Sequence, residues 1–90
     1  MPTVMFQARV KDYSAWRSGF DGNAAQRADF GGANSRVYRN ADDANDLLVM
    51  VDFADEARAR EFVGVVRKVQ EAAGVIMSTL SVALLHRKSL

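Results

Sequence analysis

The chain has 90 residues, of which 49% are hydrophobic and 26% charged, with a formal net charge of +1 and no cysteine. This length suits a single domain over residues 1–90, and the interspersed charges lack the basic stripe of nucleic-acid-binding proteins, so we expect no nucleic-acid partner. Disulfides, thiolate nucleophiles and sulfur-ligated metals are excluded, and neither a signal-peptide pattern nor an apolar run of roughly 20 residues occurs, so we expect a cytoplasmic protein with no membrane partner.

The N-terminal third predicts a strand followed by a helix. Residues 4–10 alternate, which places on one face the apolar side chains Val4, Phe6, Ala8 and Val10. Asp12 is a candidate N-cap for a helix, whose stripe at three-and-four spacing consists of Tyr13, Trp16, Phe20, Ala24 and Arg27. Gly22 favours fraying or a bend in this helix rather than a clean end, and the pair Gly31 and Gly32 supplies the left-handed residue that commonly ends one.

Two strands are predicted next, at residues 34–40 and 47–53, joined by a hairpin loop over residues 41–46 that is rich in Asp and Asn. The second of these strands is apolar on both faces. Its richer face consists of Leu47, Val49, Val51 and Phe53, and its other face carries Leu48 and Met50. Because a strand with one wet face alternates apolar and polar residues, both faces of this strand must be covered.

The last third predicts a helix and a long final strand. Asp55 is a candidate N-cap, with Glu56 in the first turn where a negative charge suits the helix dipole. The apolar stripe of this helix consists of Phe62, Val65, Val66, Val69 and Ala73. Gly64 is a candidate break inside the helix and Gly74 suits its end, after which residues 75–86 are predicted to form one strand.

The element order βαββαβ predicts an α+β fold of the ferredoxin-like class. Such a fold has a four-stranded antiparallel sheet with both helices on one face. The richer apolar faces of the strands would meet the helices, which leaves on the bare face Met5, Leu48, Met50, Ala83 and Leu85. Since contiguous apolar patches on soluble proteins usually mark interfaces, we expect a symmetric homodimer that packs through this sheet face.

Three stretches carry a family resemblance: DYSAW from Asp12, RVYRNADDAND from Arg36, and DFADEARAREF from Asp52. Over residues 10–62 the chain resembles small bacterial proteins of the dimeric α+β-barrel superfamily, which contains antibiotic-biosynthesis monooxygenase domains and proteins named cyclases. The resemblance implies the fold and the dimer but no single chemistry, because the superfamily hosts oxygenases, isomerases and dechlorinating enzymes. Its members often carry a histidine where this chain has Asn23, and a proline-containing segment where it has residues 74–77.

Trp16 and Asn23 are candidates for lining a pocket between the helices and the sheet. The resemblance implies this role, since cofactor-independent oxygenases of the superfamily bind aromatic substrates there, beside tryptophan, tyrosine, asparagine and arginine. An aromatic stripe at helical spacing is more often core, so Trp16 has a structural alternative. For Asn23, which lies one turn beyond Phe20, the alternatives are exposure on the helix surface or bonding to local backbone.

A second group of candidates lies on the predicted strands. Arg36, Tyr38 and Asn40 alternate on one face, where they converge on a cleft or, at a sheet edge, are solvated or cross the dimer interface. Asp52 is a carboxylate inside an apolar strand, which is costly unless it is paired. We expect an ion pair between Arg9 and Asp52, the alternative being a general base with a raised pKa. The candidate pocket thus consists of Trp16, Asn23, Arg36, Tyr38 and Asp52.

No catalytic residue can be assigned, and no metal or cofactor is expected. His86, the only histidine, lies beside Arg87 and Lys88 and is expected to be exposed. The acidic loop lacks the glycine and terminal glutamate of an EF-hand, and one histidine without cysteine makes neither a triad nor a transition-metal cluster. The residues favour a non-catalytic dimeric module for assembly or for binding a small aromatic ligand. The alternative is a cofactor-independent monooxygenase or cyclase-like enzyme acting on an aromatic or polyketide-type compound.

Overall fold

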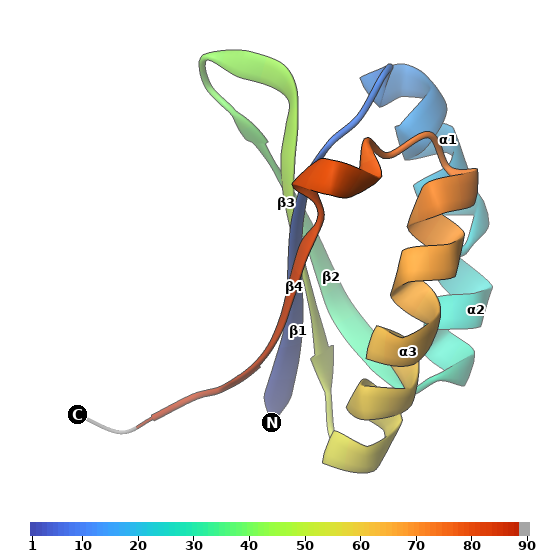
Figure 1. Ribbon diagram of the computed structural model, residues 1–90. Coiled ribbons are helices and arrows are strands. Elements are labelled where there is room, and N and C mark those ends of the chain that lie inside the picture. The colour runs from blue at the N-terminus through green and yellow to red at the C-terminus, as the bar shows by residue number, and fades with distance from the viewer. Residues whose placement is uncertain (89–90) are drawn as a thin grey trace.

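The structure, a computed structural model, describes residues 1–88 and has the predicted ferredoxin-like architecture (Figure 1). Its elements in chain order are β1 (Pro2–Arg9), α1 (Tyr13–Gly22), α2 (Ala24–Asp29), β2 (Gly32–Asn40), β3 (Asp43–Phe53), α3 (Glu56–Ala72), the 3-10 helix η1 (Met77–Thr79) and β4 (Ser81–His86). The four strands form one antiparallel sheet in the order β2-β3-β1-β4. All helices pack on one face of this sheet (Figure 1). None of the helices in residues 1–88 has the length and apolar character that a membrane crossing requires.

The core lies between the sheet and the helices. Every second side chain is buried in β1 and in residues 47–53 of β3, and the register pairs Val4 with Val51 and Phe6 with Val49. The helices complete the core with the buried side chains Trp16, Phe20, Ala59, Phe62 and Val66. The prediction that the face carrying residues 47, 49, 51 and 53 meets the helices is therefore confirmed.

The predicted helix ends are mostly confirmed. Asp12 and Asp55 cap α1 and α3, because their carboxylates accept hydrogen bonds from the N–H groups of Ser14 at 3.2 Å and Ala57 at 2.7 Å. Gly31 and Gly74 follow α2 and α3 with φ of 87° and 85°, the left-handed conformation that suits glycine. The bend expected near Gly22 is a full break between α1 and α2, whereas α3 runs through Gly64 without the break considered there.

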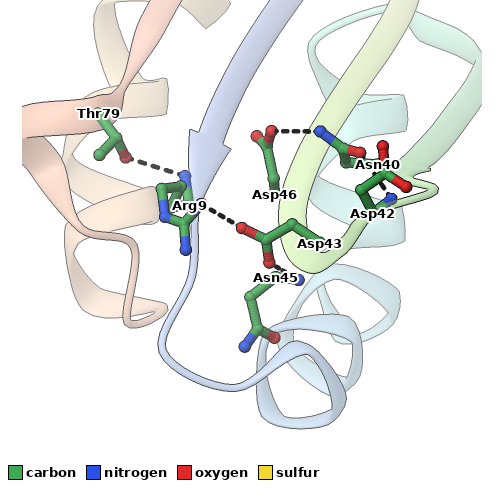
Figure 2. Close-up of polar contacts among 7 residues, drawn as sticks. All are labelled: Arg9, Asn40, Asp42, Asp43, Asn45, Asp46 and Thr79. Carbon is green, nitrogen blue, oxygen red and sulfur yellow. Dashed lines mark hydrogen bonds and ion pairs between the residues drawn. The ribbon is translucent and has the colours of Figure 1, made fainter.

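The hairpin between β2 and β3 is tighter than predicted, and assigning residues 43–46 to a loop was wrong. Asn40 pairs directly with Asp43, so β3 starts four residues earlier than expected. The turn closes because Asn40 Oδ1 accepts a hydrogen bond from the Asp42 N–H at 2.8 Å, while Asn40 Nδ2 donates to Asp46 at 3.0 Å (Figure 2). Side-chain bonds of this kind let polar residues occupy strand positions at the hairpin, where Asn45 Oδ1 also accepts a hydrogen bond from the Tyr13 N–H of α1 at 3.2 Å.

The final strand is shorter than predicted, because residues 75–80 are not part of it. Val75 makes only an isolated bridge to Val10, and η1 intervenes before β4. Thr79 Oγ1 accepts a hydrogen bond from the Arg9 N–H at 2.9 Å (Figure 2) and donates to the Ile76 carbonyl at 2.6 Å. The Thr79 hydroxyl thus replaces a backbone hydrogen bond between strands, and it stabilises the turn that leads into β4.

Candidate functional site

The sheet separates the five predicted pocket residues into two groups. Trp16 and Asn23 lie on the helical side, where both line a cleft. Arg36 and Tyr38 stand opposite Met50 and Leu48 in the pairing of β2 with β3, and residues opposite each other share a face. These two side chains and Asp52 therefore lie on the face without helices, and the five residues do not form one site.

Asp52 lies in a hydrogen-bond network on this bare face. Its carboxylate accepts bonds from Thr3 Oγ1 at 2.7 Å, Asn34 Nδ2 at 2.9 Å and Arg36 Nη2 at 2.6 Å. Hydrogen bonds from Asn34 and Thr3 hold the pKa of Asp52 below its ordinary value, and the charge of Arg36 adds to the effect. A lowered pKa is the opposite of what the general-base alternative requires.

The predicted ion pair between Arg9 and Asp52 is wrong because of the strand register. Thr3 stands opposite Asp52, while Arg9 stands opposite Asp46, about 20 Å further along β1 at the rise of a strand. Arg9 instead forms an ion pair with Asp43 at the hairpin (Figure 2). The sequence pattern identified the shared face of Arg9 and Asp52 but not their distance along it.

The convergence considered for Arg36, Tyr38 and Asn40 occurs only for Tyr38 and Asn40. A register shift lies between Arg39 and Asn40, and Asn40 bonds across the hairpin to Asp46. Arg36 points to Asp52, and Tyr38 is 53% exposed. Tyr38 and Asn40 line an open, shallow groove of about 230 Å³ beside Leu48 and Asp46, which Arg36 does not line.

The cleft on the helical side lies between α1, α2 and α3 above β1. Its walls are mostly apolar and include four phenylalanines, namely Phe6, Phe20, Phe30 and Phe62. Its polar members are Asn23, Gln26, Arg27 and Gln70. The space open to the centre of a water-sized sphere is about 30 Å³, and one water needs about 10–15 Å³ by this measure, so the cleft in this form holds roughly two waters. A larger ligand requires one wall to move.

Trp16 and Gln70 form the inner end of this cleft. Trp16 is 1% exposed and stacks on Phe20 with ring centroids 5.0 Å apart. Its Nε1–H donates to Gln70 Oε1 at 2.9 Å, and Gln70 is itself buried in α3. Gln70 was not among the predicted site residues, although a polar residue four positions after Val66, in the spacing of the apolar stripe, is a signal for it. Trp16 combines the core role and the pocket role that were considered as alternatives.

Arg27 lies at the cleft on α2, against the end of α1. Its Cζ lies 3.7 Å from the centre of the Phe20 ring, and its Nη1 donates to the Phe20 carbonyl at 2.6 Å. This geometry combines a cation–π contact with capping of the last turn of α1. Partial burial lowers the pKa of Arg27, and the repulsion from Arg17 adds to this effect. The sequence placed Arg27 on the helical stripe but not among the candidate site residues.

The only histidine lies outside the cleft. His86 Nε2 is 2.7 Å from Glu56 Oε1, and its side chain is 46% exposed, as the sequence predicted. The contact joins the end of β4 to the first turn of α3. Over residues 1–88 the structure contains no group of three or more His, Asp or Glu side chains arranged to hold a metal ion.

Comparison with known proteins defines the fold of this chain. No family model matches it, and no curated protein matches its sequence. A mutant of SnoaB, a cofactor-independent oxygenase from Streptomyces nogalater, has a TM-score of 0.77 at 18% identity over 99% of this chain and 94% of that one. A conserved protein from Methanosarcina mazei has a TM-score of 0.75 at 11% identity, with 97% and 92% covered.

A putative antibiotic biosynthesis monooxygenase from Nitrosomonas europaea has a TM-score of 0.69 at 14% identity, with 97% of this chain and 98% of that one covered. At such identities the likeness establishes the fold. The chain therefore has the ferredoxin-like fold of these oxygenase and monooxygenase structures, and the predicted resemblance in fold is confirmed.

Proposed function

We propose that this protein binds a flat aromatic small molecule in the cleft between its helices and its sheet. The observation that carries the proposal is the lining of the cleft, in which phenylalanine rings and Trp16 surround a few polar groups, among them Asn23 and Gln70. Ligand sites typically combine apolar walls with a small number of placed polar groups that fix orientation. The likeness in fold to an oxygenase supports the proposal but does not identify the ligand.

The wall that moves to admit the ligand is α2. None of its residues is buried, and it lies between the helix break at Asn23 and the left-handed Gly31. Arg58 of α3 holds its far end by donating to the carbonyls of Asp29 and Phe30, the second bond being 3.3 Å long. Short elements with few buried contacts open at low free-energy cost, so an outward movement of α2 enlarges the cleft without unfolding the sheet.

Calorimetric titration with aromatic compounds of one to three rings tests the proposal. Val69 lines the cleft, so Val69→Phe fills the space and is expected to abolish binding. Val63 packs on the core from the same helix but does not line the cleft, so Val63→Phe is the matched control and is expected to retain binding. If Val69→Phe binds the compounds as well as the unchanged protein does, the ligand site lies elsewhere.

Cofactor-independent oxygenation of the bound compound is the second candidate function. The likeness in fold to SnoaB favours this function. The side chain of Asn23, which lines the cleft, also favours it, because its amide N–H can stabilise an anion that develops on an aromatic substrate. Arg36 and Tyr38, which were predicted from the sequence to belong to the candidate pocket, lie on the other side of the sheet. We expect the protein to consume oxygen in the presence of an electron-rich phenolic compound, and we expect Asn23→Ala to lower the rate of oxygen uptake without changing the affinity for the compound. If the compound binds but no oxygen is consumed, the protein binds the compound without oxygenating it.

We also propose that a second copy of the chain covers the bare sheet face. The apolar side chains on this face include Met5, Leu48, Met50 and Leu85, the last of which is 40% exposed. The arginines on the same face, Arg9 and Arg36, are each paired with an aspartate, so two copies can approach without repulsion between uncompensated charges. Light scattering at micromolar concentration is expected to give the mass of a dimer.

A further inference from the structure

We propose that the aromatic ligand of the cleft carries a carboxylate group and that Arg27 binds this group. The inference rests on the proposed function and adds the charge and chemical class of the ligand. It starts from the composition of the cleft. Of the 14 residues that line it, Arg27 is the only one that carries a charge.

The positive charge of Arg27 has no carboxylate partner. Within residues 1–88 no Asp or Glu oxygen lies at ion-pairing distance from its guanidinium. Asp21 is the nearby acid that acts on Arg27 electrostatically, but its carboxylate is bonded to Arg17 Nε at 3.1 Å. Arg17, Asp21 and Arg27 together leave one net positive charge at the cleft.

The hydrogen-bonding capacity of Arg27 is also mostly unused. A guanidinium has five N–H donors in a planar fork. Nη1 donates to the Phe20 carbonyl, and the Phe20 ring covers one face of the group. The edge formed by Nε and Nη2 has no acceptor within residues 1–88, and this pair of donors matches the two oxygens of a carboxylate.

The position of Arg27 explains why the partner is an aromatic acid. Partial burial removes hydrogen bonds that the guanidinium would otherwise make to water. A carboxylate on the ligand replaces these bonds and also supplies the opposite charge. Arg27 lies half-buried on the α2 side of the cleft, whereas Trp16 of α1 and Phe62 of α3, which also line it, are buried. A ligand with a ring system at one end and a carboxylate at the other matches the order of these groups, with the acid at α2 and the rings toward α1 and α3.

Calorimetry with matched acids and amides tests the inference. The probes are benzoate, naphthalene-2-carboxylate and anthracene-2-carboxylate, each compared with its neutral carboxamide, which has nearly the same shape. We expect the acids to bind about tenfold or more tightly than the amides, the ratio that a charge-assisted bidentate contact supports. Arg27→Gln is expected to remove this preference by weakening acid binding about tenfold while changing amide binding less than about twofold.

Arg67→Gln is the control variant, because it removes the same charge from an exposed residue of α3 that does not line the cleft and leaves the pair of Arg17 and Asp21 intact. It is expected to keep the preference for acids. Equal binding of acids and amides, or loss of the preference in both variants, would overturn the role of Arg27 while leaving aromatic binding intact. Binding of neither series would overturn the proposed function as well. Since Arg27→Gln also removes a cap from α1, Arg27→Lys, which keeps the charge without the fork, is expected to retain a reduced preference for acids.

Discussion

The indole Nε1 of Trp16 lies 2.9 Å from Oε1 of Gln70, and this buried hydrogen bond joins α1 to α3 across 54 residues of sequence. It fixes the ring that forms the inner end of the cleft. Gln70→Leu leaves the indole N–H without an acceptor, so we expect the free energy of unfolding to fall by about 1–3 kcal/mol. Urea denaturation followed by circular dichroism measures this change.

The control for this prediction is the same substitution in a Trp16→Phe background. Phenylalanine has no N–H, so Gln70→Leu no longer leaves a buried donor unpaired, and its cost there is expected to be small. An equal loss of stability in both backgrounds would mean that Gln70 stabilises the fold by packing rather than through Trp16.

Asp52 makes stability depend on acid pH. Its folded pKa lies below the ordinary value of 3.8, so its bonds stabilise the folded state above that pH, and this contribution is lost as the pH falls through the folded pKa. Asp52→Asn is expected to lower the free energy of unfolding at neutral pH by about 1.5–3 kcal/mol, as for hydrogen bonds to a charged group. Urea denaturation from pH 7 to 2 should show the difference between the two proteins shrinking in acid, whereas a constant difference would contradict the account.

Met50 lies at the centre of the bare sheet face, opposite Met5 on β1 and Arg36 on β2. Met50→Lys places a charge where the second copy is proposed to pack, and burying this charge without a partner opposes association. We expect light scattering to change from the mass of a dimer to that of a monomer. Ala15→Lys, at an exposed position of α1, is expected to leave the dimer intact. A monomeric unchanged protein at micromolar concentration would contradict the assembly.

Arg58 ties α2 to α3 through the carbonyls of Asp29 and Phe30. Arg58→Ala releases this end of the cleft wall, so we expect faster amide hydrogen exchange over residues 24–30, with the exchange in β1 and β3 unchanged. Arg60→Ala is the matched control on the same helix, since within residues 1–88 Arg60 pairs only with Glu56, one turn before it, and makes no hydrogen bond to α2. Equal exchange in the two variants would show that Arg58 does not restrain α2.

The fold was predictable from the sequence where hydrophobic periodicity and glycine positions are decisive. Leu47, Val49, Val51 and Phe53 can be buried only together, so their face was fixed before any pairing was known. Gly31 and Gly74 end helices at positions where other residues are strained. The start of β3 was not predictable in this way, because Asp43 to Asp46 have the composition of a loop and join the strand through side-chain bonds at the hairpin.

The candidate site was less predictable, because it depends on which side of the sheet each residue faces and how far along it lies. Alternation grouped Arg36 with Tyr38 correctly but could not show that the sheet separates them from Trp16. The ion-pair partner of Arg9 depends on the register in which β1 pairs with β3, and the alternation of residues within one strand does not specify this register. Gln70 and Arg27 became recognisable as members of the cleft only when α1, α2 and α3 were placed around it.

Ligand binding in the cleft is tested most directly by NMR, because the chain contains a single tryptophan and therefore a single indole N–H resonance. Naphthalene-2-carboxylate is titrated into the isotope-labelled protein while the amide spectrum is recorded. Our account predicts that the Trp16 indole resonance shifts together with the backbone amides of Gly19, Asn23 and Val69, which line the cleft. Shifts confined to Tyr38, Leu48 and Met50 on the opposite face, or no shifts at millimolar ligand, would contradict it.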